Sequence, residues 1–131
     1  MATLTFPLID GVAGTIDVSY TTSIINEFVE DILVTAFEGG INYWCSGVFP
    51  ENDSWPENVT YASECLTHGT NLVIFEDDDG EAVQHLLTMH KFLTGLEDFI
   101  RYRGTSVFDD YDAADADCII QFAIFGEIVY G

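Results

Sequence analysis

The sequence predicts an α+β fold: a single domain over residues 1–131, with a small mixed or antiparallel sheet and two to three packed helices. Segments that alternate polar and apolar residues, as half-buried strands do, are interspersed with segments whose apolar residues recur at helical spacing. The composition agrees with this class, because 131 residues, 48% of them hydrophobic, are enough to build one core.

The N-terminal part predicts a hairpin followed by the clearest helix. Residues 3–6 and 15–20 alternate polar and apolar side chains, with glycines between them for a turn. The helix is expected over residues 23–38, with Ser23 as its N-cap and the pair Gly39–Gly40 as its end. One helix face is apolar, and the opposite side carries Glu27, Glu30, Asp31 and Glu38.

The middle of the chain predicts two strands and a second helix. Aromatic and β-branched residues favour a strand over residues 41–49, and the two prolines in residues 50–57 favour a loop. Residues 59–66 fit either helix or strand. An apolar run predicts a buried strand over residues 72–75, and the acidic turn after it is expected to begin a helix over residues 81–94.

The C-terminal part adds an acidic loop and an apolar segment. Gly95 either ends the second helix or weakens it before residues 96–102. The acidic loop is expected over residues 109–117. Residues 118–125 are apolar nearly all round, so they form either a buried helix or a central strand.

Charge is the property that most restricts the function. The chain has 23 acidic residues against three basic ones (Lys91, Arg101 and Arg103), so its formal net charge is −20. A charge this far from zero repels itself and indicates a basic partner, bound cations or a salty environment. The aromatic content of 14% excludes a disordered acidic tail, because such tails are poor in aromatic residues.

We expect the acids to form a partner-binding surface that imitates nucleic acid. Each strand of DNA carries a negative charge about every 3.4 Å, and acids one helical turn apart are separated by roughly 6 Å. The predicted surface consists of Glu27, Glu30, Asp31, Glu38, Asp77, Asp78, Asp79, Asp109, Asp110, Asp112, Asp115 and Asp117. The alternative is a merely solvated exterior, as in salt-adapted proteins.

A smaller candidate is an aromatic contact patch of Tyr43, Trp44 and Trp55, although core packing is expected for at least one of these rings. Direct binding of nucleic acid is not expected, because basic residues to contact phosphates are scarce. A homodimer is compatible with the exposed aromatic residues, but self-repulsion opposes it.

No metal, cofactor or catalytic residue is expected. Cys65 and His68, with Cys45, lack the second close pair of ligands typical of zinc sites. The aspartate clusters lack the ligand spacing of a calcium-binding EF-hand loop. His90 is interpreted as a hydrogen-bonded core histidine rather than a general base. A small metal-dependent enzyme is the competing hypothesis.

The host cytosol is the expected location. The N-terminal residues lack the basic region and apolar run of a signal peptide. No apolar run reaches membrane-spanning length. The three cysteines form no disulfide-scaffold pattern, which favours a reducing compartment.

Two stretches resemble known proteins. The segment EDILVTAFEGGINYW at residues 30–44, and the ending DADCIIQ with FGEIVYG within residues 115–131, resemble small uncharacterised acidic proteins encoded by phages and prophages. The resemblance implies a phage-type context, in which small acidic proteins often act as DNA mimics. The expected function is therefore non-enzymatic inhibition of a host defence or repair protein, as in anti-CRISPR or anti-restriction proteins. The alternatives are an accessory protein that binds a host factor without mimicry, and a salt-adapted domain.

Overall fold

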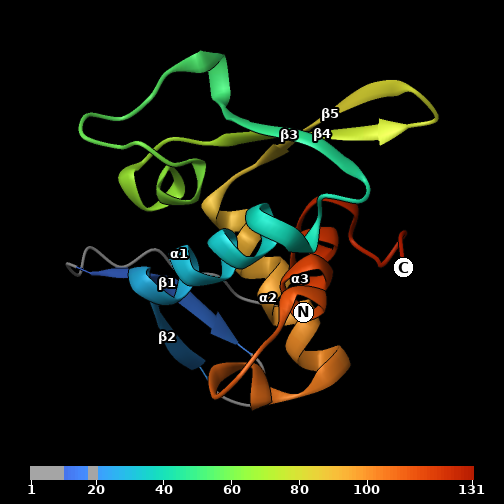
Figure 1. The fold of residues 1–131 in the computed structure, drawn as a ribbon. Coiled ribbons are helices and arrows are strands. Elements are labelled where there is room, and N and C mark those ends of the chain that lie inside the picture. Colours follow the sequence, from blue (N-terminus) through green and yellow to red (C-terminus); the bar gives the residue numbers. More distant parts are fainter. Residues whose placement is uncertain (1–10, 18–20) are drawn as a thin grey trace.

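Strands and helices alternate along the chain, and the computed structural model describes residues 11–17 and 21–131 of it. Within these ranges a two-stranded sheet and a three-stranded sheet, both antiparallel, surround three α-helices (Figure 1). The predicted α+β class is confirmed. The expected strand at residues 3–6 lies outside the described residues.

The N-terminal hairpin pairs β1 (Val12–Asp17) with β2 (Thr21–Ile25). Its β2 strand occupies the start of the predicted helix, so the prediction that Ser23 caps that helix is wrong. Residues 21–25 are mostly β-branched, which favours a strand, and Ser23 lies opposite Thr15 in the ladder.

Helix α1 (Asn26–Thr35) is followed without a break by a π-helical turn, Ala36–Gly40. Its apolar face is buried as predicted, with Val29, Ile32 and Leu33 all fully enclosed. The opposite face is exposed to solvent at Glu27, Asp31 and Glu38. The amphipathic pattern therefore predicted this element's orientation correctly, although not its first residue.

The larger sheet has the order β3–β4–β5, with β3 (Cys45–Pro50), β4 (Leu72–Asp78) and β5 (Glu81–Leu87) all antiparallel. The predicted buried strand at residues 72–75 is confirmed as part of β4. Residues 59–66 contribute short 3₁₀ turns instead of a helix or strand.

The predicted helix over residues 81–94 is wrong in its first half, because residues 81–87 form β5. The dipeptide Asp79–Gly80 makes a two-residue hairpin turn, and both residues have positive φ, 55° and 87°. This is the backbone that Asp-Gly favours between antiparallel strands. Helical spacing of apolar residues outweighed that turn signal in the prediction.

Helix α2 (Met89–Arg103) begins after the N-cap Thr88 and runs through Gly95 without interruption. His90 is exposed in its first turn, so the prediction of a core histidine is wrong.

Residues 118–125, which fitted either a helix or a strand, belong to helix α3 (Ala113–Phe125). Asp112 caps α3, so the acidic loop is shorter than expected.

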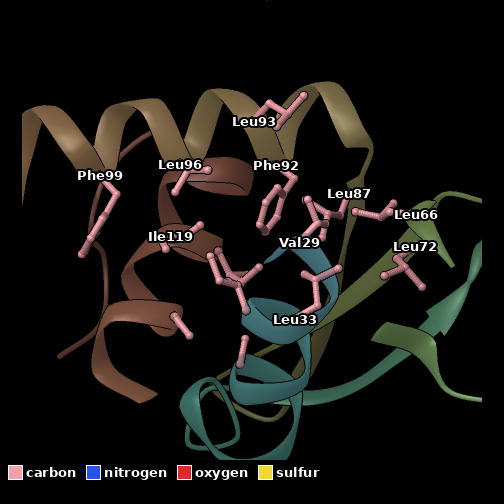
Figure 2. Packing of buried hydrophobic residues seen from close by; sticks show 14 of the residues in the cluster. Val29, Leu33, Leu66, Leu72, Leu87, Phe92, Leu93, Leu96, Phe99 and Ile119 are labelled. Atoms are coloured by element: carbon pink, nitrogen blue, oxygen red, sulfur yellow. The ribbon is translucent and has the colours of Figure 1, made fainter. Parts of the chain in front are cut away.

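The core lies where the three helices meet the inner face of the β3–β4–β5 sheet. Figure 2 shows Val29 of α1, Phe92 of α2 and Ile119 of α3 among its side chains. Leu72 and Leu87 reach the same cluster from the sheet. Buried apolar area of this kind provides the main driving force for folding.

The contact between α2 and α3 depends on Gly95. A Cβ atom at this position would lie 2.6 Å from the Ala123 nitrogen and 2.7 Å from the Ile119 oxygen. Backbone atoms cannot give way as a flexible side chain can, so the two helices approach each other this closely only with glycine here.

We predict that Gly95→Ala lowers the free energy of unfolding by about 1 to 3 kcal/mol, the usual cost of overpacking. Alanine's better helix propensity, up to about 1 kcal/mol, opposes this effect. The matched control is Gly39→Ala, where an added Cβ meets nothing within 4 Å. Urea unfolding measures both variants. A Gly95→Ala protein as stable as Gly39→Ala would contradict the close helix contact.

Candidate functional site

An open groove of about 600 Å³, here called the α1 groove, lies among the described residues. One wall comes from α1 and its π-helical turn, which contribute Glu30, Asp31, Val34, Phe37 and Glu38. The other wall comes from Tyr61 and the 3₁₀ turn that follows it, Ala62–Glu64, which contributes Ala62, Ser63 and Glu64. The groove therefore forms where α1 passes a segment about thirty residues further along the chain.

The lining of the α1 groove is acidic and partly apolar. Its four carboxylates are Glu30, Asp31, Glu38 and Glu64, and no basic side chain lines it. The Thr67 hydroxyl donates a hydrogen bond to Glu30, which orients this carboxylate. Val34 is 36% exposed and Tyr61 is 67% exposed, so apolar surface is open to solvent beside the charges. This combination suits a ligand with both a positive charge and an apolar portion.

Aromatic packing brings further acids to the same helix. The Phe28 ring of α1 lies 5.6 Å from the Phe108 ring and 6.1 Å from the Tyr111 ring, centroid to centroid. Burial raises the pKa of Tyr111, and the nearby Asp31 charge raises it further. The segment around Tyr111 therefore lies beside α1. The exposed carboxylates of the two elements make up the α1 acidic face: Glu27, Asp31, Asp109, Asp110 and Asp112.

The remaining predicted surface acids lie elsewhere. Asp77, Asp78 and Asp79 are exposed at the tip of the β4–β5 hairpin. In Figure 1 that tip lies at the opposite end of the molecule from the segment that precedes α3. Asp115 is half-buried and completes a capping box with Asp112. The predicted acids therefore do not form one strip, and the largest group gathers around α1.

Asp117 is a buried structural residue, so its prediction as part of the acidic surface is wrong. It is 6% exposed and accepts three hydrogen bonds. The donors are the Tyr43 hydroxyl at 2.5 Å, the Trp44 indole nitrogen at 2.8 Å and the Gln121 amide at 2.8 Å. Trp44 is 2% exposed, so its prediction as a contact residue is also wrong. Tyr43 and Trp55 are exposed, as a contact patch requires.

A second buried carboxylate, Glu76, anchors the C-terminal segment. The Tyr130 hydroxyl and the His85 ring both contact Glu76, the latter at 2.7 Å. The Tyr130 ring stacks on Trp44 at 5.5 Å, nearly parallel at 4°. The Gln121 side chain also binds the backbone of residues 129–130. Sequence analysis missed this network, although an acid inside an apolar strand pattern is a signal for it.

The three basic side chains all belong to α2 and make local contacts. Arg101 bonds the fully buried Glu97 at 3.1 Å, and the backbone N–H of Asp17 donates to the same carboxylate. Lys91 donates to the Leu86 carbonyl, and Arg103 lies over the Tyr102 ring. The α1 groove therefore receives no compensating charge from these residues.

Potential metal ligands and cysteine thiols are present in the described part of the chain. No group of three His, Cys, Asp or Glu side chains is arranged there to hold a metal ion. Burial raises the pKa of Cys45, Cys65 and Cys118, which disfavours the reactive thiolate form. Among the described helices, none has the length and apolarity needed to span a membrane.

Comparison of the chain with known protein families, with curated protein sequences and with solved structures gives no match. The functional argument therefore depends on the geometry and charge described above.

We predict that Tyr43 and Tyr130 titrate later in the folded protein than an unperturbed tyrosine does. The hydrogen bond to Glu76 raises the pKa of Tyr130 to about 12, and burial together with Asp117 raises the pKa of Tyr43 to about 12. Both pKa values are raised in the folded protein. The stability that the two hydroxyl groups give to the folded state is therefore complete below pH about 10 and is lost as the pH rises towards about 12. Ultraviolet absorption by phenolate measures this titration.

The Tyr130→Phe variant should lose the late titration of that residue and keep the one of Tyr43, and the protein unfolded in urea should show neither. If every tyrosine of the folded protein titrates near pH 10, the buried network around Glu76 and Asp117 is not formed in solution.

Proposed function

We propose that the protein is a non-enzymatic inhibitor that occupies a basic nucleic-acid-binding groove of a host defence or repair protein. The observation that carries this proposal is the gathering of exposed carboxylates on the α1 acidic face, beside a groove whose lining contains no basic side chain. A nucleic-acid-binding groove presents the opposite charge and is shaped for a polyanion.

The spacing of the acids supports mimicry of a phosphate backbone. Glu27 and Asp31 are one helical turn apart on the exposed side of α1, a separation of roughly 6 Å. Long-range attraction between opposite charges would mainly accelerate association, and packed contacts would set the dissociation rate. The resemblance of residues 30–44 and 115–131 to acidic phage-encoded proteins points in the same direction, by analogy.

Exposed aromatic residues favour a second candidate, an accessory protein that binds a host factor without mimicry. Trp55 is 43% exposed and Phe49 is 52% exposed, and both side chains are large enough to act as interface anchors. Under this hypothesis Trp55→Ala abolishes binding, and reversal of surface charge does not.

The test begins with capture of a partner from bacterial lysate on the immobilised protein at low salt, followed by elution with a salt step. We predict that the partner's affinity falls at least about tenfold between roughly 0.05 and 0.5 M salt. We also predict that duplex DNA or RNA competes for the same site. Calorimetry or surface plasmon resonance measures both effects.

The location of the interface is tested with two double variants that change the net charge equally. Glu27→Lys with Asp110→Lys alters the α1 acidic face, and Asp78→Lys with Glu81→Lys alters the hairpin tip. We predict that the first pair weakens binding about tenfold or more and that the second pair has a much smaller effect.

Three results would contradict the proposal. The first is an affinity that stays constant with salt, and the second is a partner that binds the protein and nucleic acid simultaneously. The third is folding only at molar salt, which would favour a salt-adapted domain instead.

A further inference from the structure

We propose that the α1 groove binds an arginine- or lysine-containing segment of the partner protein, with the basic group held by the groove's carboxylates. This inference rests on the proposed function in taking the partner to be a basic protein. It adds the location of the anchoring contact and the chemistry of the segment that makes it.

The charge argument comes from carboxylates on both walls. Asp31 and Glu38 approach from α1 and its π-helical turn, and Glu64 approaches from the opposite wall. Like charges that converge on one space repel each other, and a cation placed between them removes that repulsion. The lining contains no lysine or arginine of the chain itself, so the cation must come from another molecule.

The apolar part of the lining indicates a side chain rather than a metal ion. Val34, Phe37 and Tyr61 line the groove together with the carboxylates, and Tyr61 is the most exposed large hydrophobic side chain of the described residues at 67%. Arginine and lysine carry a hydrocarbon stem that packs on such surface while the charged end stays polar. A guanidinium group also stacks on a tyrosine ring. A hydrated metal ion uses neither contact.

Ser63 supplies an independent indication of a ligand. It lines the groove, is only 6% exposed, and its hydroxyl has no hydrogen-bond partner among the described residues. Every fully enclosed side-chain polar atom in that part of the chain does have a partner, so the Ser63 hydroxyl is not fully enclosed, and the residue lines the groove. A hydroxyl can donate to a peptide carbonyl, which carboxylates cannot do. The groove therefore offers contacts for a polypeptide backbone as well as for a basic side chain.

The test uses a short capped peptide of alternating arginine, leucine and alanine, titrated into the ¹⁵N-labelled protein and followed by NMR. We expect the largest shifts at Val34, Phe37 and Ser63. Glu64→Gln and Tyr61→Ala should each weaken peptide binding by roughly three- to tenfold. The matched control is Glu127→Gln, an exposed acid outside the groove that should leave the affinity unchanged.

The inference is overturned if the shifts map outside the groove, or if Glu64→Gln and Glu127→Gln weaken binding equally. It is also overturned if spermine binds the groove more tightly than the peptide, because the site would then be one for polyamines. Salt-sensitive capture of a nucleic-acid-binding partner that Glu64→Gln leaves intact would retain the proposed function and reject the groove. If the peptide binds in the groove but nucleic acid does not displace the captured partner, the groove inference would be retained and the proposed function would be rejected.

Discussion

The scarcity of cations governs how this protein is built. With 23 acids and three lysine or arginine side chains, a carboxylate that enters the interior must be satisfied mostly by donors other than lysine and arginine. Asp117 receives hydrogen bonds from Tyr43, Trp44 and Gln121, and Glu76 contacts Tyr130 and His85. The described residues include three buried acids, and among these Glu97 alone is paired with arginine. Breaking such a contact leaves a buried charge unsatisfied, which costs much more than the loss of a surface hydrogen bond.

The hydrogen bonds of the buried acids link distant segments of the chain, and the acids around α1 remain at the surface. The hydrogen bonds around Asp117 and Glu76 join the turn at residues 41–44 before β3, strand β4, helix α3 and the C-terminal segment. Residues 30–44 and 115–131 therefore meet in this network. Among the acids around α1, Asp112 caps α3 and Glu30 accepts a hydrogen bond from Thr67, whereas Glu27, Asp31, Asp109 and Asp110 are exposed to solvent. They are free to face a partner, at the cost of mutual repulsion.

Sequence periodicity predicted the elements whose apolar pattern is strong and local. The buried face of α1 and the strand that contains Leu72 follow directly from such patterns. Strand β5 was missed because its apolar residues also fit helical spacing. That pattern outweighed the Asp79–Gly80 hairpin turn, which is the feature that places a strand here. The interior role of Asp117 could not be predicted, because its three donors come from residues 43, 44 and 121. Likewise, the α1 groove arises from two segments that only the tertiary fold brings together.

The most direct test of the account is the hydrogen–deuterium exchange footprint of the protein in complex with its captured partner. The account predicts slower exchange over α1 and residues 108–112, and slower exchange in the partner's nucleic-acid-binding groove. Protection confined to the β4–β5 hairpin or to the region of Trp55, with the partner's groove still exchanging freely, would contradict it.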